Sequence, residues 1–190
     1  MTKKLILESL ANGIPAIHED MVGYYKHSCM VCFHTQGYTS GVKFKVVRKG
    51  MADTYYQICW TGEVTDELMR QYAGTSRKLN DYAPTTRTID DAACAIALLL
   101  VRELTEYTAI SKARIGTTVD YYLISKNQNT DLLFNEAEAR LEVSGILSET
   151  KNNTVTARVK EKRERLAPED MPTFIVIVEF SNPYAKVVKE

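Results

Sequence analysis

A run of ten uncharged residues, 92–101, constrains the fold more than any other part of this 190-residue sequence. It follows Thr88-Ile89-Asp90-Asp91, which resembles a helix-capping box with Asp in place of the usual Glu, and predicts a helix over residues 88–107. Because this helix is apolar on nearly every face, it must be buried, most economically against a β-sheet. Ten residues fall well short of the ~18 that span a bilayer, so no membrane helix is expected.

Strands and a second helix are predicted downstream of the buried helix. The residue types predict strands over 117–124 and 139–146, a helix over 154–167 and a final strand over 173–180. Residues 110–115 are a candidate for a further short strand. We therefore expect an α/β core over residues 86–190, with a mixed, partly antiparallel central sheet flanked by helices.

The first 85 residues predict a β-rich region. Strands are expected over 27–34, 42–47 and 54–60, and a short helix over 65–73. Residues 74–87 are polar and rich in turn-forming types, which predicts a connector. Residues 1–85 are thus expected to form a β-rich elaboration of the core, the two parts making one compact unit.

Equal numbers of basic and acidic residues, 24 of each, limit the possible partners. A protein that coats nucleic acid nonspecifically usually has a strong basic excess, because its affinity comes from neutralising phosphates. Binding to a polyanion is therefore expected only at local patches. The candidates are two runs of basic residues: Lys43, Lys45, Arg48 and Lys49, and Arg158, Lys160, Lys162, Arg163 and Arg165. Acidic residues within the second run favour an exposed helix face as its simpler interpretation.

Four irregularly spaced cysteines and no recognisable export signal predict a reduced, cytoplasmic protein. Two of these cysteines and two histidines lie within residues 27–34. A zinc cage normally needs a second pair of ligands elsewhere in the chain, and this sequence offers none. The segment therefore does not predict a zinc site.

Two acidic residues on adjacent predicted strands form the candidate functional site. Asp120 alternates with Val119 and Tyr121, and Glu142 lies between Leu141 and Val143, so each acid projects away from apolar neighbours. If the two strands pair, the carboxylates converge on one face. A hard cation such as Mg²⁺ or Mn²⁺ is one use for such a pair, and a solvated outer face of the hairpin is the simpler alternative.

The element order and these acids resemble the PD-(D/E)xK nuclease superfamily, which has the restriction-endonuclease-like fold. The resemblance covers residues 88–180 and rests on the buried helix with a late Glu, on Gly116-Thr117-Thr118-Val119-Asp120 and on Leu141-Glu142-Val143-Ser144-Gly145. It implies that Asp120 and Glu142 are metal ligands and that Glu103, or alternatively Glu106, is the helical acid that completes the site. It also implies that a metal-activated water hydrolyses nucleic-acid phosphodiesters, with DNA a more expected substrate than RNA.

One position departs from the superfamily pattern. Ser144 stands where the motif has Lys, and a neutral hydroxyl cannot supply the positive charge that positions water and stabilises the transition state. Lys162 falls in the stripe of its predicted helix that faces the sheet, so it is a candidate to replace the missing lysine, with Arg158 one turn earlier as the alternative. A surface lysine whose stem covers the sheet edge is the simpler interpretation of Lys162.

Two alternatives to a nuclease remain open at this stage. The first is a catalytically inactive relative that keeps the fold and binds nucleic acid or protein, as Ser144 and the zero net charge suggest. The second is a structural protein whose strand acids have no chemical role. A homodimer is the default expectation for a nuclease that must cut two strands.

Overall fold

The computed structural model describes residues 2–75, 82–114, 116–128, 137–166 and 171–190. They form an α/β fold built on one mixed sheet of eight strands in the order β1-β3-β2-β10-β9-β8-β7-β6. The strands of this sheet are β1 Lys3–Ile6, β2 Val42–Arg48, β3 Thr54–Cys59, β6 Tyr107–Lys112, β7 Tyr121–Ser125, β8 Ala139–Ile146, β9 Thr173–Glu179 and β10 Tyr184–Lys189. The other elements are η1 Leu7–Ala11, α1 Glu19–Thr35, α2 Asp66–Tyr72, the small hairpin β4 Ala73–Thr75 with β5 Tyr82–Pro84, α3 Thr86–Leu104 and α4 Val155–Arg165.

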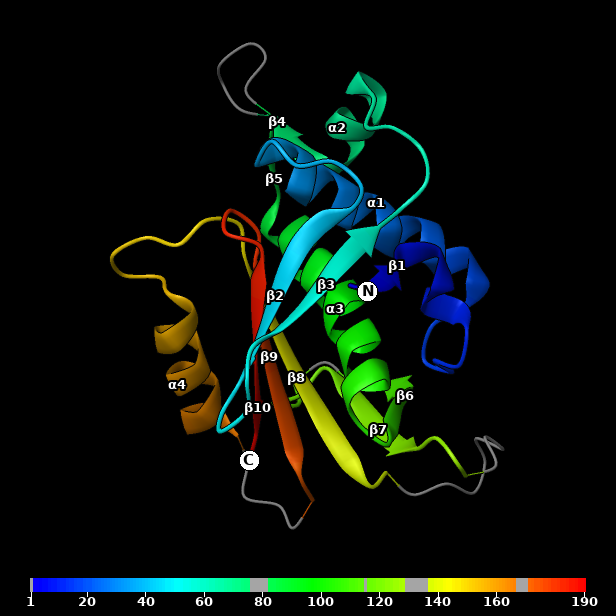
Figure 1. The fold of residues 1–190 in the computed structure, drawn as a ribbon, viewed down its shortest axis with the longest axis vertical. Coiled ribbons are helices and arrows are strands. Elements are labelled where there is room, and N and C mark those ends of the chain that lie inside the picture. The colour runs from blue at the N-terminus through cyan, green and yellow to red at the C-terminus, as the bar shows by residue number, and fades with distance from the viewer. Residues whose placement is uncertain (1, 76–81, 115, 129–136, 167–170) are drawn as a thin grey trace.

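Helices cover both faces of the sheet (Figure 1). Helices α1 and α3 pack against each other, and α3 lies on β8 and β9. Helix α4 lies on the opposite face, where Val155 and Val159 contact Ile175 and Ile177 of β9 in a second, smaller core. Within the described residues, no helix is long and apolar enough to cross a membrane.

The predicted buried helix is confirmed as α3. It starts at Thr86 rather than Thr88, because the Thr85 side chain caps it by accepting a hydrogen bond from the backbone N–H of Thr88 at 3.1 Å. Residues 92–101 are all buried between α1 and the sheet. This packing is the reason that a helix can be apolar all round.

The core elements follow in the order α3, β6, β7, β8, α4, β9. Strands β6, β7 and β8 form an antiparallel meander, and α4 crosses over to bring β9 parallel to β8. The predicted strand over 139–146 is confirmed in full, whereas the candidate strand over 110–115 overlaps β6 only at residues 110–112, because β6 begins at Tyr107 and ends at Lys112. Strand β7 begins at Tyr121, four residues later than predicted, and residue 167 of the predicted second helix lies outside the described residues.

One prediction in the N-terminal half is wrong. Residues 27–34 lie in helix α1 and do not form a strand. Residues 28–33 are all buried, so the segment shows no amphipathic period, and a short apolar run of this kind is compatible with either structure. The strands predicted over 42–47 and 54–60 are confirmed as β2 and β3, and the helix over 65–73 as α2.

The N-terminal strands belong to the same sheet as the core. Strand β10 pairs with β9 on one side and with β2 on the other, so β1, β3 and β2 extend the core sheet. The predicted boundary after residue 85 falls at the start of α3, and residues 76–81 of the predicted connector lie outside the described residues.

Candidate functional site

Asp120 and Glu142 each lie one residue beyond Tyr121 and Leu141, the last paired residues of β7 and β8. Strands β7 and β8 pair from Tyr121 with Leu141 onward, and the backbone N–H of Asp120 donates to the carbonyl of Leu141 at 2.9 Å. The next residue along β8 is Glu142, so the two acids occupy adjacent, same-face positions. Beyond Glu142, β8 continues to Ile146, whereas β7 begins only at Tyr121.

The two carboxyl groups interact strongly. Burial, and after it the charge of Asp120, raise the pKa of Glu142 to about 7. The Asp120 carboxylate is held by a hydrogen bond from the backbone N–H of Val143 to Oδ2 at 2.7 Å. The Glu142 residue is only 7% exposed, so one carboxyl of the pair is fixed by the backbone and the other lies in a low-dielectric setting.

Lys162 reaches this pair from α4. Thr154 caps the helix, Val155 and Val159 anchor it on the sheet, and the same stripe carries Lys162 to the acids. The Lys162 Nζ contacts the Glu142 Oε1 as an ion pair, with the lysine side chain 18% exposed. This favourable contact lowers the pKa of Glu142 and partly offsets the effects of burial and of Asp120.

Of the other two candidates, Ser144 lies on the same face as Glu142, whereas Arg158 does not contact the strand acids. Ser144 is buried two residues after Glu142 on β8 and so shares its face of the sheet. Arg158, the alternative cation, contacts Asn153 and Glu161 instead of the strand acids. The structure therefore brings together Asp120, Glu142, Ser144 and Lys162 in one region.

A helical acid near this region is Asp90, a residue of the predicted capping box. The backbone N–H of Gly145 donates to Asp90 Oδ1 at 3.5 Å. Burial raises the pKa of Asp90, the Lys162 charge lowers it, and the Asp120 charge raises it further. These mutual effects mean that Asp90, Asp120 and Lys162 lie within electrostatic range of one another.

Gly145 allows the start of α3, which carries Asp90, to lie close to strand β8. A Cβ at Gly145 would lie 2.5 Å from the carbonyl oxygen of Ile89, so only glycine allows the first turn of α3 to approach β8 this closely. Two sequence features could have pointed to Asp90: Gly145 at the end of the motif, and the position of Asp90 in the first turn of the predicted helix. To use them, one would have had to know which end of the helix meets the strand acids.

Glu103 and Glu106 do not join the acids, which corrects the predicted helical ligand. Glu103 is exposed at the opposite end of α3 and forms an ion pair with Lys3 at 2.5 Å. It lies 13 residues beyond Asp90, which is about 20 Å along a helix. Glu106 follows the end of the helix and is exposed. The late position that suggested these residues places them at the wrong end.

The donor set suits a hard divalent cation. Asp120 and Glu142 supply carboxylate oxygens, and Mg²⁺ is commonly held by one or two carboxylates while keeping several waters. No group of three or more His, Cys, Asp or Glu residues in the described parts of the chain is arranged to hold a metal ion. The carboxylates in this region are those of Asp120 and Glu142, with Asp90 nearby.

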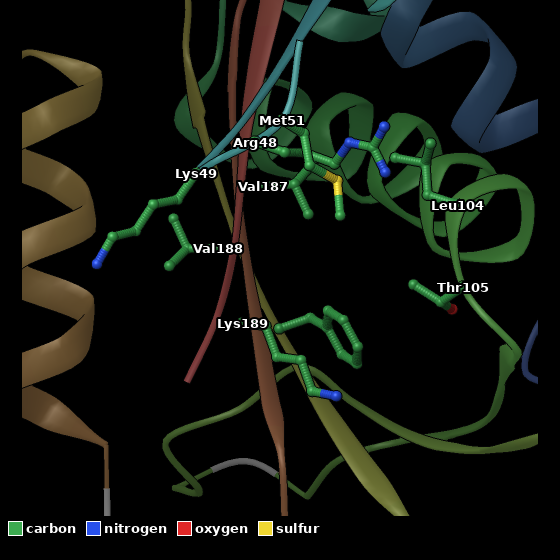
Figure 2. Close-up of a pocket in the computed structure, with 9 residues that line it drawn as sticks. Arg48, Lys49, Met51, Leu104, Thr105, Val187, Val188 and Lys189 are labelled. Carbon is green, nitrogen blue, oxygen red and sulfur yellow. The ribbon is translucent and has the colours of Figure 1, made fainter. Parts of the chain in front are cut away.

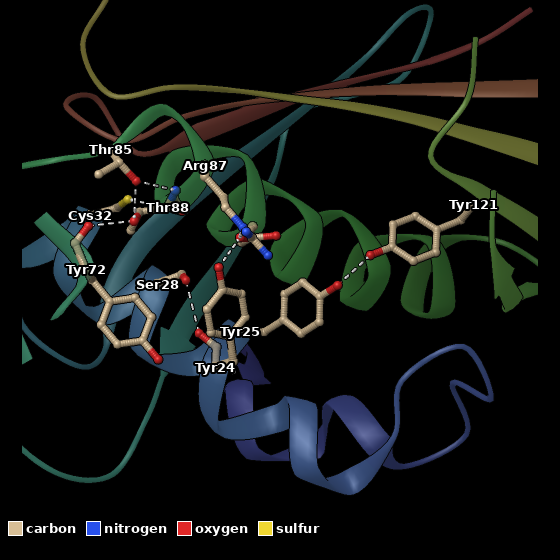
Figure 3. Close-up of polar contacts among 10 residues, drawn as sticks. Tyr24, Tyr25, Ser28, Cys32, Tyr72, Thr85, Arg87, Thr88 and Tyr121 are labelled. Carbon is tan, nitrogen blue, oxygen red and sulfur yellow. Dashed lines mark hydrogen bonds and ion pairs between the residues drawn. The ribbon is translucent and has the colours of Figure 1, made fainter. Parts of the chain in front are cut away.

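A polar network holds the other side of α3 (Figure 3). The hydroxyl of Tyr25 is 2.9 Å from that of Tyr121, the residue after Asp120, and the hydroxyl of Tyr24 donates to Asp91 Oδ2 at 2.6 Å. These contacts tie α1 to the start of β7 and to the first turns of α3. They fix the two elements that carry Asp90 and Asp120.

A separate pocket of about 300 Å³ lies at the far end of α3 (Figure 2). Leu104 and Thr105 form one wall, and Phe174, Val187 and Lys189 from β9 and β10 form the other, with Arg48 at the end of β2. The strand acids do not line it. Its position near Glu103 rather than Asp90 separates it from the candidate site.

The basic run of α4 is neutralised within the molecule. Each of its members has an acidic partner: Arg158 and Arg165 pair with Glu161, Lys160 with Glu164, Lys162 with Glu142 and Arg163 with Glu190. This supports the interpretation of the run as an exposed helix face, apart from Lys162.

Comparison of the chain with protein-family models, with curated proteins and with solved structures found no match.

Proposed function

We propose that this protein is a metal-dependent nuclease that hydrolyses nucleic-acid phosphodiesters, with DNA as the preferred substrate over RNA. The observation that carries the proposal is the meeting of Asp120 and Glu142 where the pairing of β7 with β8 ends, with the ammonium of Lys162 beside them. The order α3, β6, β7, β8, α4, β9 supports a restriction-endonuclease-like core, because the resemblance rests on the same succession of a buried helix, strands, a helix and an apolar strand.

Asp120 and Glu142 would hold Mg²⁺ or Mn²⁺. When bound, the ion would polarise the phosphoryl group and lower the pKa of water at the site. When the metal ion binds Glu142, the ion pair between Lys162 and Glu142 would break, and the ammonium of Lys162 would lie near the phosphate. The neutral side chain of Ser144 cannot supply this positive charge. Asp90 would hold the edge of the site through its contact with the backbone of Gly145.

The ion pair between Lys162 and Glu142 favours a second candidate. It compensates one buried acid without any metal ion, as a binding protein that has lost catalysis would require. In that case the fold would serve to bind nucleic acid or protein.

Incubation of the purified protein with labelled single-stranded and duplex DNA and RNA, with Mg²⁺ or Mn²⁺, tests the proposal. We expect cleavage that falls by at least about 100-fold in Glu142→Gln and Asp120→Asn, a loss of the size seen for other catalytic groups. Glu164→Gln, on the exposed side of α4, is the matched control and should cleave at the wild-type rate.

Calorimetric titration with Mn²⁺ separates the two candidates. Cleavage that survives Glu142→Gln would belong to another site or to a contaminant. Absence of cleavage together with Mn²⁺ binding that is lost in Asp120→Asn would favour an inactive relative. Absence of Mn²⁺ binding to the wild-type protein would overturn the metal site itself.

A further inference from the structure

The face of β1, β3 and β2 on the α4 side is largely open, whereas that of β10 is partly covered, with Val188 buried against α4 and Tyr184 packed beside it. Helix α4 packs mainly on β9 and β8, and α1 and α3 lie on the other side of the sheet (Figure 1). Register identifies the residues on this face: Lys186 of β10 is opposite Ile177, which contacts α4, and Val47 of β2 is opposite Lys186. Alternate residues of the same strands therefore share this face.

Lysines and tyrosines dominate the open face. We define the lysine–tyrosine face by these residues: Lys4 of β1, Tyr55 of β3, Lys43 and Lys45 of β2, Lys49 directly after β2, and Tyr184 and Lys186 of β10. Figure 2 shows Lys49 directed toward α4, whereas Arg48 is directed toward α3.

Lysines outnumber acids on this face, although the whole chain has no net charge: the acids beside it are Asp53, Glu149 at Tyr184, and Glu179. The face carries five lysines, and Asp53 pairs with one of them, Lys45, at 2.8 Å. Glu179 of β9 lies beside Tyr184 but is fully buried and accepts hydrogen bonds from the backbone N–H groups of Ser181 and Asn182. The excess positive charge is therefore complementary to a chain of phosphates.

Two tyrosines flank a lysine in one row across the sheet. Lys45 is opposite Tyr55 on one side and Tyr184 on the other, which places the two tyrosine backbones about 10 Å apart. Tyr55 is 44% exposed, with the ammonium of Lys43 4.6 Å from its ring centroid. Tyr184 is less accessible, because its ring packs against the smaller core under α4 and its hydroxyl donates to Glu149 at 3.3 Å. Aromatic rings on an open sheet can stack with unpaired bases, which a duplex does not present.

The face leads toward the candidate site along another row. Glu142 is opposite Ile175, Ile175 is opposite Val188, and Lys49 follows Arg48, which is opposite Val187. Three strand spacings separate Glu142 from Lys49, or about 14 Å. Both residues lie on the α4 side of the sheet, but Ile175 and Val188 between them are buried under α4, so a strand bound to the lysine–tyrosine face would reach the acids only by passing around α4.

We propose that the lysine–tyrosine face binds single-stranded nucleic acid, with phosphates on the lysines and bases on Tyr55. The conclusion that single strands are the substrate rests on the proposed nuclease function. Binding of a single strand to this face requires neither a metal ion nor cleavage. A flexible single strand can follow a sheet surface and expose its bases, as in other sheet-based single-strand platforms.

Fluorescence anisotropy with labelled 12-nucleotide oligo(dT) and the whole protein in EDTA tests the proposal. We expect binding that weakens as salt rises, and that weakens at least about tenfold in Lys43→Glu and in Lys186→Glu because phosphate contacts are lost. Lys160→Glu makes the same charge change on α4 and should alter affinity less than about twofold, since only exposed helix surface changes. Tyr55→Leu should weaken binding at least about fivefold without a change in circular dichroism.

The proposal would be overturned if Lys43→Glu, Lys186→Glu and Tyr55→Leu all bound as tightly as the wild type. It would also be overturned if Lys160→Glu weakened binding as much as these variants do. A third contrary result would be that duplex DNA or polyglutamate competes as effectively as unlabelled oligo(dT). The last would identify a general anion or acidic-protein surface. Because EDTA prevents metal-dependent cleavage, retained oligo(dT) binding with no nuclease activity would overturn only the proposed catalysis. Cleavage without oligo(dT) binding at this face would overturn only the present inference.

Discussion

The ammonium of Lys162 and the carboxylate of Glu142 form an ion pair between α4 and β8, although 20 residues separate them in sequence. The same carboxylate is a proposed metal ligand, so lysine and metal compete for it. Replacing Lys162 with Met should therefore strengthen Mn²⁺ binding severalfold while reducing cleavage at least about 100-fold, because the positive charge near the phosphate is lost. Calorimetry and a cleavage assay on the same preparation measure both effects. Weaker Mn²⁺ binding in Lys162→Met would contradict the competition.

Proton binding to Glu142 should control metal affinity. Burial and the charge of Asp120 raise the pKa of this carboxyl to about 7, and a metal ion binds its deprotonated form. We expect Mn²⁺ affinity to rise about tenfold per pH unit below the pKa and to level off above pH ~7. Calorimetric titrations from pH 5.5 to 8 check this. An affinity that does not change over this range would show that Glu142 is not a ligand.

The same raised pKa predicts how stability depends on pH. The folded protein holds the Glu142 proton more tightly than the unfolded chain, whose Glu pKa is about 4.5, so the free energy of unfolding falls as pH rises from about 4.5 to about 7. Gln cannot ionise, so the stability of Glu142→Gln relative to wild type should rise by about 1–3 kcal/mol across this window. Urea unfolding at pH 5 and pH 8 measures the change. Glu164→Gln is the exposed control, and an equal trend there would exclude Glu142 as the cause.

Gly145 should tolerate no side chain. Its added Cβ would meet the backbone of Ile89 at 2.5 Å, so Gly145→Ala should lower the free energy of unfolding by about 1–3 kcal/mol through overpacking. Gly23, in α1, has no atom within 4 Å of its added Cβ. Gly23→Ala should instead raise stability by about 0.5–1 kcal/mol, because alanine favours helix. Urea unfolding of both variants tests the pair, and a neutral Gly145→Ala would contradict the close approach of α3 to β8.

Asp90, rather than Glu103, should matter for cleavage. Asp90 lies near Asp120 and Lys162, whereas Glu103 pairs with Lys3 at the other end of α3. We expect Asp90→Asn to reduce cleavage at least about tenfold through the altered electrostatics of the site, and Glu103→Gln to leave it within about twofold. Initial rates at saturating Mn²⁺ compare them. The reverse order of effects would restore Glu103 as the helical acid.

The sequence was sufficient to predict those elements whose local residue pattern, together with the flanking residues, is compatible with a single structure. Residues 92–101 can only form a buried helix or a buried strand, and the capping residues before them decide for helix. Alternation around Asp120 and Glu142 predicted that both acids face one way, and the spacing from Val155 through Val159 to Lys162 predicted that the lysine faces the sheet.

Other features depended on contacts distant in sequence. Asp90 meets Gly145 only because α3 crosses β8 at its N-terminal end, and no local pattern specifies that crossing. Residues 28–33 are buried on every side by α3 and the sheet, which removed the period that would have identified α1. Strand β10 follows a turn after β9, and its partner β2 lies about 140 positions earlier in the sequence.

This placement of β10 dictates an assembly order. Strands β1, β2 and β3 can pair as soon as they leave the ribosome, yet β2 keeps an open hydrogen-bonding edge until residues 184–189 arrive. Closing so distant a parallel pair is slow, and an uncovered strand edge invites association between nascent chains. Strand β10, the latest in the sequence of the eight strands of the sheet, thus fills the gap between β2 and β9, and cellular yield should depend on how long the edge of β2 is shielded.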